Sequence, residues 1–314
     1  MLVYEDVPDA QAGVGEALIE LRAASLNHLD LWIRKGLPSV PKPRILGADG
    51  AGIVRALGPD TEASVAAGDR VVINPGLQDG RHVVGEHRDG THAELIAIPV
   101  DYVHRIPGDL SFEEAAAFPL ISLTAFRMLV VRAEVKADEW VLVWGAGSGV
   151  SAAAIQIAHA RGARVLVASS DDSKLERVRE LGAIATVNHT RDDVVATVRD
   201  LTDGAGADVV VDHVGEATWS RSLASAGLGG RIVVCGATSG PNPPANLPRV
   251  WWKELSILGS TMGDRADFAG VLDLVAAGSL RPTVDTVFPL ASAADAHRRL
   301  ESGDQFGKVV VSIG

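Results

Sequence analysis

Apolar runs separated by glycine and proline turns mark the first part of the chain, up to about residue 120. Val, Ile and Leu are concentrated in these runs, which is typical of strands in a β-rich domain. The runs are Glu16–Arg22, Ala51–Leu57, Asp69–Ile73 and Ala93–Ile98. The pattern predicts short strands joined by turns, in the manner of an irregular barrel.

A different pattern begins near residue 122 and continues to about residue 260, where strand, glycine-containing turn and helix follow one another repeatedly. The strands are continuous runs of aliphatic residues, which indicates a parallel sheet covered by helices on both faces. The expected strands are Trp140–Trp144, Arg164–Ala168, Asp208–Asp212 and Arg231–Cys235, with helices over Ala152–Ala160 and Ser173–Leu181. The remaining segment predicts helices over Phe268–Ala277 and Ala291–Ser302 and a closing strand, Lys308–Ser312.

The composition restricts the class of protein. A chain of 314 residues is long enough for two domains, and 47% hydrophobic with 22% charged residues is a globular profile. The net charge of −11 argues against a surface for nucleic acid or anionic membrane. No apolar run reaches the roughly 18–20 residues that span a bilayer, and no signal-peptide pattern opens the chain. We therefore expect a soluble, cytoplasmic protein.

The one cysteine of the chain, Cys235, excludes an intramolecular disulfide and a four-cysteine zinc site. It ends an apolar strand, which favours a core position over a role as nucleophile.

A glycine-rich turn after the strand Trp140–Trp144 carries the clearest chemical signal. Its glycines allow a tight turn whose backbone N–H groups face a diphosphate, and the following helix adds positive potential. We expect the dinucleotide contacts to come from Gly145, Gly147, Ser148, Gly149 and Val150, with Ser151 in the place of a third glycine. The alternative is a tight turn that binds nothing.

The next strand ends in hydroxyl and charged residues. Ser169, Ser170 and Lys174 suit a ribose 2′-phosphate, which favours NADPH over NADH. Asp171 and Asp172 argue the other way, because a carboxylate here holds a ribose hydroxyl in NAD-type sites, unless it caps the helix.

Several further motifs stand in a fixed order along the chain. They are Asn27–Asp30, Gly47–Gly52, Gly68–Val71, Gly90–Glu94, Glu113–Pro119, Leu123–Ala125 and Phe306–Val310. Together they resemble the medium-chain dehydrogenase/reductase superfamily over nearly the full length, in its quinone oxidoreductase-like and zinc-binding dehydrogenase-like branch. The resemblance implies an α/β protein with a β-rich GroES-like catalytic domain, 1–121 completed by 262–314, and a Rossmann doubly wound parallel-sheet cofactor domain, 122–261. It also implies a homodimer.

The zinc positions of that family are altered in this chain. Where zinc-dependent alcohol dehydrogenases have a cysteine, a histidine and a second cysteine, this chain has Asn27, Ala48 and Leu120. None of the three supplies a thiolate or an imidazole, and the four-cysteine structural lobe is also missing, so we expect no zinc. A different metal site is a second hypothesis, in which Asp30 and Asp49 face a cluster of possible ligands. The cluster consists of His82, Glu86, His87, Asp89 and His92. The alternative is a polar surface loop that binds no metal.

Without a Lewis acid, the favoured reaction is hydride transfer to a quinone or an α,β-unsaturated carbonyl. We expect Asn27 to orient the nicotinamide or a substrate oxygen, unless it is a turn residue. The resemblance places His28 near the cofactor phosphates or in a proton path. The alternative is a solvated histidine without a role in the site. Asp49 and Asp30 match carboxylates that lie behind the zinc ligands in the zinc enzymes. Without a metal, we expect them to hold hydrogen bonds in the loops; the alternative is a role as general acid. Thr124 donates to the nicotinamide amide or caps a helix.

The resemblance assigns the rest of the cofactor site to the carboxyl edge of the sheet and to one lysine. These residues are Val214, Gly215, Gly236, Ala237, Thr238, Ser260, Thr261 and Lys308. Lys308 is expected to reach the diphosphate or to be a surface lysine. The leading hypothesis is an NADPH-dependent quinone or enone reductase acting on a small molecule. The alternatives are an alcohol or carbonyl dehydrogenase with an atypical metal and an inactive dinucleotide-binding sensor.

Overall fold

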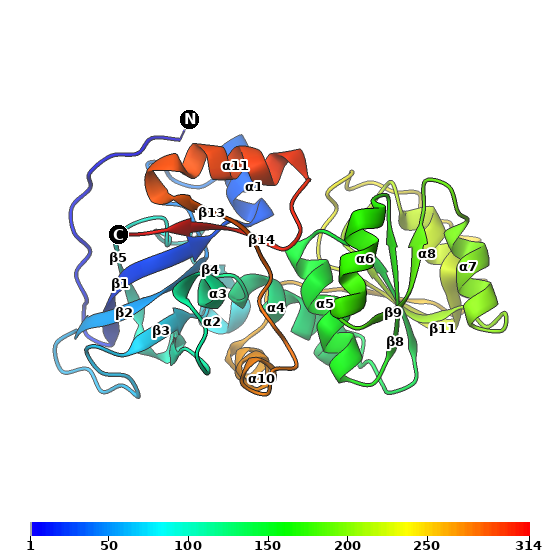
Figure 1. Ribbon diagram of the computed structural model, residues 1–314, viewed down its shortest axis with the longest axis horizontal. Helices are drawn as coiled ribbons and strands as arrows, with labels where there is room; N and C mark the ends of the chain where they lie inside the picture. The colour runs from blue at the N-terminus through cyan, green and yellow to red at the C-terminus, as the bar shows by residue number, and fades with distance from the viewer. Residues whose placement is uncertain (1) are drawn as a thin grey trace. The chain divides into compact units, whose positions relative to one another are not determined.

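The apolar runs of the chain form two sheets, each in its own unit of the computed structural model, which describes residues 2–314. Unit 1 contains the chain up to Leu123 together with Met262–Ala276 and Arg281–Gly314. Unit 2 contains Thr124–Thr261 and Ala277–Leu280. Figure 1 shows the chain coloured along its length, so that the red C-terminal segment can be followed back into the blue sheet of unit 1.

Unit 1 is built on a seven-stranded sheet in the order β13-β14-β1-β2-β3-β6, with β5 also paired to β1. The strands are β1 Glu16–Ser25, β2 Asp49–Leu57, β3 Arg70–Ile73, β5 Leu95–Pro99, β6 Val103–Arg105, β13 Val284–Pro289 and β14 Lys308–Ser312, with the short β4 His82–Val83 outside the sheet. Side chains alternate between buried and half-buried along most of β1, as expected for a strand with one face on the core. The core includes Ile19, Leu21 and Val309.

The helical segments of unit 1 are short and lie mostly in the connections between strands. They are α1 His28–Lys35, α2 Leu77–Gly80, η1 Val100–Tyr102, α3 Phe112–Ala116, α10 Arg265–Ala276, η3 Leu290–Ser292 and α11 Ala293–Ser302. Helix α4, Pro119–Phe126, contains the boundary between the two units. Helix α11 packs on β13 and β14, which places the C-terminal segment over this sheet (Figure 1).

Unit 2 is a parallel six-stranded sheet in the order β12-β11-β10-β7-β8-β9. The strands are β7 Trp140–Trp144, β8 Arg164–Ser169, β9 Ala183–Asn188, β10 Ala207–Asp212, β11 Ala226–Val234 and β12 Ser256–Gly259. The helical segments are η2 Arg127–Arg132, α5 Gly149–Ala160, α6 Asp172–Glu180, α7 Val194–Leu201, α8 Trp219–Ser225 and α9 Leu247–Trp252. The strand order reverses between β7 and β10, and nucleotides bind at the carboxyl ends of strands at such a reversal.

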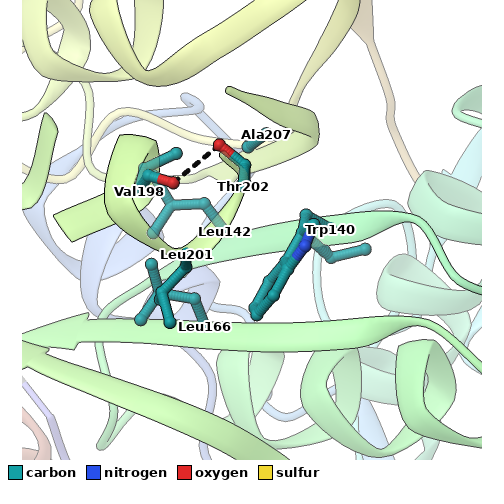
Figure 2. Close-up of a pocket in the computed structure, with 8 residues that line it drawn as sticks. Trp140, Leu142, Leu166, Val198, Leu201, Thr202 and Ala207 are labelled. Atoms are coloured by element: carbon teal, nitrogen blue, oxygen red, sulfur yellow. Dashed lines mark hydrogen bonds between the residues drawn. The ribbon is translucent and has the colours of Figure 1, made fainter. Parts of the chain in front are cut away.

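A shallow apolar hollow, too narrow to enclose a water molecule, lies between the sheet of unit 2 and α7 (Figure 2). Its lining residues are Trp140, Val141, Leu142, Leu166, Val198, Leu201, Thr202 and Ala207. Trp140 and Ala207 open their strands, so the hollow reaches toward the amino ends of β7 and β10, the opposite end from the glycine-rich turn. Its lining carries no charged group.

None of the helices in residues 2–314 has the length and apolar character needed to cross a bilayer.

Candidate active site

Strand register in unit 1 brings three polar side chains from distant parts of the chain together. In β1, Ser25 lies opposite Val310 of β14 on one side and opposite Asp49 of β2 on the other. Asn27 follows the end of β1, and Lys308 opens β14. The ends of three neighbouring strands therefore place Asn27, Asp49 and Lys308 beside one another.

These three side chains form a buried hydrogen-bonded cluster, which we call the Lys308 cluster. The Lys308 ammonium donates to Asn27 Oδ1 at 2.5 Å and to Asp49 Oδ2 at 3.0 Å. Asn27 Nδ2 donates to the same Asp49 oxygen at 2.9 Å. The side chains are nearly inaccessible, since Lys308 is 3% exposed and Asp49 is 0% exposed. A buried charge pair of this kind is tolerated only because its partners are close and further hydrogen bonds complete it.

Two more groups complete the coordination of the Asp49 carboxylate. Ser25 Oγ donates to Oδ2 at 3.1 Å, and the backbone N–H of Leu120 donates to Oδ1 at 2.7 Å. Two of the positions that correspond to zinc ligands in the resemblance, Asn27 and Leu120, thus both donate to a carboxylate. Reasoning from the sequence missed Ser25 and the Leu120 amide, because neither contact is encoded by a side-chain motif.

A second buried group lies next to the Lys308 cluster. Asp30 accepts from the backbone N–H groups of Asn27 at 2.7 Å and Gly47 at 2.8 Å. Burial raises the pKa of Asp30, and these two hydrogen bonds oppose that rise. Asp30 therefore ties the start of α1 to the Gly47 loop.

His92 and His297 are a buried imidazole pair whose ring centroids lie 6.3 Å apart, edge to face. Burial lowers the pKa of each to about 4, and the charge of Lys308 further lowers that of His92. Nε2 of His92 and both ring nitrogens of His297 have no hydrogen-bond partner within residues 2–314. Both rings are therefore neutral at pH 7.

The five residues of the suggested His82–His92 metal cluster do not converge on one point. The rings of His82 and His87 stack at 4.5 Å, and His87 Nδ1 accepts from the backbone of Val83. Asp89 accepts from the backbone of Ile45, whereas His92 lies beside His297. In the described part of the chain, no three His, Cys, Asp or Glu side chains are grouped so as to hold a metal ion.

His28 and Thr124 are the two other residues predicted to act in catalysis. His28 is the first residue of α1, half-buried, with its ring 6.3 Å from that of Trp32. Thr124 is buried inside α4, so it is not at the position of a helix N-cap. The roles of His28 and Thr124 in catalysis stay predictions.

In unit 2, the glycine-rich turn connects β7 to α5. Gly145 has a φ of +81°, a conformation that glycine adopts without strain. Ser148 caps α5, its Oγ accepting from Ser151 N at 3.0 Å. Gly147, Gly149 and Val150 are half-buried at the N-terminus of this helix. Backbone N–H groups and the helix dipole meet here, so the turn fits a diphosphate.

Ser151 and His213 lie directly behind this turn. The Ser151 hydroxyl donates to Trp144 O at 3.0 Å, and its oxygen lies 2.8 Å from His213 Nε2. The same imidazole nitrogen lies 3.3 Å from Ser148 Oγ. Burial lowers the pKa of His213, although Asp212 opposes the change. His213 carries no motif, and its contact with the turn follows only from the sheet order.

The adjacent strand β10 ends in a carboxylate that organises its own loop. Asp212 accepts from the backbone N–H groups of Val214 at 2.9 Å and Gly215 at 3.0 Å, and from the hydroxyls of Thr218 and Ser222. Gly215 has a φ of +90°, and a Cβ there would lie 2.5 Å from a backbone oxygen. Only glycine suits this position.

The remaining cofactor positions of the sheet lie at this same carboxyl edge. Gly236, Ala237 and Thr238 follow β11, and both the N–H and the hydroxyl of Thr238 donate to His213 O. Ser260 and Thr261 follow β12, where Ser260 is buried and Thr261 is exposed. Parallel strands end at one edge, which is why these positions gather there.

The loop after β8 shows what its two carboxylates do. Asp171 caps α6, accepting from Ser173 N at 2.8 Å and Lys174 N at 3.3 Å. Asp172 pairs with Arg191 at 2.6 Å. These contacts lower the pKa of both carboxyl groups.

The two serines ahead of those carboxylates differ in access. Ser169 is buried at the end of β8, and its Oγ accepts from Asp171 N at 3.4 Å. Ser170 is exposed.

Comparison with known proteins gives the family. Residues 13–108 match the family model of the alcohol dehydrogenase GroES-like domain, and residues 149–277 match that of the zinc-binding dehydrogenases. A zinc-type alcohol dehydrogenase-like protein of Schizosaccharomyces pombe is 36% identical over 95% of this chain and 91% of its own. The chain belongs to the medium-chain dehydrogenase/reductase superfamily.

The proteins similar to this dehydrogenase/reductase are named for more than one activity. A quinone oxidoreductase of Pseudomonas aeruginosa is 32% identical over 99% of this chain and 95% of its own. A solved NAD-dependent alcohol dehydrogenase is 46% identical with a TM-score of 0.95, covering 99% of this chain and 95% of that one. The predicted fold class, with its GroES-like and Rossmann domains, is confirmed, and so is an oxidoreductase that uses a nicotinamide cofactor.

The medium-chain dehydrogenase/reductase described here differs from zinc enzymes of its superfamily at the catalytic metal position. Zinc prefers thiolate and imidazole ligands, whereas Asn27 and Asp49 hold the ammonium of Lys308. Both oxygens of Asp49 already accept hydrogen bonds. This donor set does not fit a catalytic zinc ion.

Proposed function

We propose that the protein is a zinc-independent, NADPH-dependent oxidoreductase that reduces a quinone or an α,β-unsaturated carbonyl. The observation that carries the proposal is the buried Lys308 ammonium, held by Asn27 and Asp49. Hydride addition to such a substrate leaves negative charge on an oxygen, and a fixed positive charge stabilises that oxygen. A lysine cation replaces the metal ion in this role.

The Lys308 cluster has donors for such an oxygen. An ammonium group has three N–H bonds, of which two are directed to Asn27 Oδ1 and Asp49 Oδ2, and the proposal assigns the third to the substrate oxygen. Asp49 and Asn27 orient the ammonium group by accepting these two hydrogen bonds. The bound nicotinamide supplies the hydride.

The loop after β8 supports NADPH over NADH. Oδ1 of Asp171 caps α6, and both oxygens of Asp172 pair with Arg191, so contacts within the protein hold the two carboxylates. We assign exposed Ser170 and Lys174, in the first turn of α6, as the partners of the 2′-phosphate, because a hydroxyl and an ammonium group suit a phosphate. A phosphate there also gains from the N-terminus of α6.

We also propose that the protein is a homodimer joined through β12. This strand ends the parallel sheet, so one row of its backbone groups has no neighbouring strand within the sheet. Nearby apolar side chains are exposed: Ile257 at 45%, Trp251 at 59% and Trp252 at 76%. A second copy of the chain covers such a surface and continues the sheet.

The test is the oxidation of NADPH and NADH with a panel of quinones and enones after exhaustive chelation. Because a similar solved structure is an NAD-dependent alcohol dehydrogenase, NAD⁺ with primary and secondary alcohols forms a parallel arm. We expect NADPH-dependent reduction that survives chelation. Activity that returns only with added metal, or alcohol oxidation as the sole reaction, would overturn the proposal, as would tight nucleotide binding without turnover.

A further inference from the structure

Ser151 connects the glycine-rich turn to His213. The Ser151 hydroxyl donates its proton to Trp144 O, so its oxygen is an acceptor toward His213 Nε2 at 2.8 Å. The hydroxyl oxygens of Ser151 and Ser148 lie 2.8 Å apart. His213 Nε2 therefore contacts the hydroxyl groups of both Ser148 and Ser151 in the first turn of α5. At this position the glycine pattern has a third glycine, which provides no such connection.

The His213 ring also supports the backbone of the turn. A Cβ on Gly145 would lie 3.7 Å from His213 Cε1 and Nε2 and 3.4 Å from Ser151 Oγ. The imidazole thus lies beside the place that a Cβ of residue 145 would take. Loss of the ring removes both a hydrogen bond and a packing surface from one point.

We propose that His213 is a positioning residue for the nucleotide diphosphate, acting through Ser151 and Ser148. His213 Nε2–H donates to Ser151 Oγ and satisfies it, which leaves the Ser148 hydroxyl proton for a phosphate oxygen at the helix N-terminus. Ser148 Oγ at the same time accepts from Ser151 N and so stays in place. The inference rests on nucleotide binding in the proposed function, but not on the choice of substrate or of NADPH.

The charged and titratable surroundings agree with this role. Asp212 is the neighbouring carboxylate, and its oxygens are occupied by Val214, Gly215, Thr218 and Ser222. Burial lowers the pKa of His213, so the ring is neutral at pH 7 and has one N–H to donate. The backbone groups of Trp144 and of His213 itself also hydrogen-bond to this ring. The proposal assigns the N–H to Nε2, where Ser151 Oγ accepts it, because the Ser151 proton is used on Trp144 O.

The test compares His213→Leu with His213→Gln by direct binding of NADPH and NADH, followed by fluorescence. Gln places an amide N–H where Nε2–H stands, whereas Leu removes the donor. We expect His213→Leu to raise the dissociation constant of both nucleotides about five- to tenfold, as for one lost hydrogen bond. His213→Gln should restore most of the affinity, and kcat at saturating nucleotide should stay within about twofold.

A double-mutant cycle with Ser151→Gly separates positioning from general packing. In the Ser151→Gly background the 2.8 Å contact with Ser151 is gone and only the longer 3.3 Å contact of His213 with Ser148 remains, so His213→Leu should cause less than about a twofold further change. His159→Gln is the matched control, since His159 is an exposed histidine near the far end of the same helix. Its affinities should equal those of the wild type.

Four results would overturn the inference. They are unchanged affinity in His213→Leu, failure of Gln to rescue, an undiminished effect in the Ser151→Gly background, and a fall in kcat as large as the loss of affinity. If the wild type reduces quinones while any of these results is obtained, the proposed function stands and only the role of His213 is wrong. If the wild type binds neither nucleotide, both proposals are wrong.

Discussion

Lys308 Nζ lies 3.0 Å from Asp49 Oδ2, although 259 residues separate the two in the chain. The contact exists because the closing strand β14 pairs with β1, and β1 pairs in turn with β2. A buried cation and its counter-ion are thereby fixed at the adjoining ends of three strands.

Removal of one partner of the pair should destabilise the protein strongly. Lys308→Met leaves the Asp49 carboxylate buried without its cation, and we expect a loss of about 3–5 kcal/mol in the free energy of unfolding. Lys308→Met with Asp49→Asn removes both charges and should recover at least half of that loss. Urea denaturation followed by circular dichroism measures both. The exposed Lys136→Met is the control, and a Lys308→Met protein as stable as this control would contradict the assignment.

The same pair of variants tests the catalytic role. The double variant should fold and bind NADPH with wild-type affinity, while its kcat for quinone reduction falls about 100-fold or more, as for a lost oxyanion donor. Single-turnover reduction at saturating NADPH measures the chemical step. A double variant with normal kcat would exclude Lys308 as the group that stabilises the substrate oxygen.

The buried histidine pair predicts a pH dependence of stability. Folding lowers the pKa of His92 and His297 from 6.5 to about 4, so the unfolded chain binds more protons between these two values. The stability that both neutral rings contribute is complete above pH 6.5 and is lost as the pH falls toward 4. Asp30, whose pKa is raised, works in the opposite direction at acidic pH.

Thermal melts from pH 8 to pH 4 check this prediction. His297→Leu should have a flatter profile than the wild type over that range, whereas exposed His159→Gln should keep the wild-type slope. Equal slopes in wild type and His297→Leu would mean that the His297 ring does not titrate between the folded and unfolded states as proposed.

Nucleotide selectivity depends on the loop after β8. Ser170→Ala with Lys174→Ala should weaken NADPH about tenfold or more and leave NADH unchanged, because only NADPH carries the 2′-phosphate. Arg177→Ala, on the same helix, serves as the control for a lost positive charge. Calorimetric titration gives both affinities. An equal loss for the two nucleotides, or no loss, would contradict the 2′-phosphate assignment.

The oligomeric state tests the β12 surface. Ile257→Lys and Trp252→Glu place charges on the exposed edge and should convert a dimer into monomers in size-exclusion chromatography with light scattering. Val287→Lys makes the matched change on β13, the edge strand of the other sheet, where Val287 is 43% exposed. A wild-type monomer, or dissociation by Val287→Lys alone, would contradict the proposal.

The pattern of apolar residues alone was sufficient to predict the bounds of strands that are continuous apolar runs. The strands Trp140–Trp144 and Lys308–Ser312 were expected with the bounds that the structure has, because an uninterrupted apolar run is typical of a strand buried on both faces. Strand β11 was expected to begin at Arg231 but begins at Ala226, since Gly227, Gly229 and Gly230 resemble a turn. Pairing of Ala226 with Ala207 of β10 extends this strand despite its glycines.

The order of residues in the chain by itself determined the family, the two kinds of sheet and the glycine-rich turn. Each of these is encoded by neighbouring residues and by motifs that are recognised from the spacing of their residues along the chain. The partners of Lys308 and the contact of His213 with Ser151 were decided by the tertiary structure alone. Strand register and sheet order bring such groups together across long stretches of chain, and burial then makes each contact energetically important.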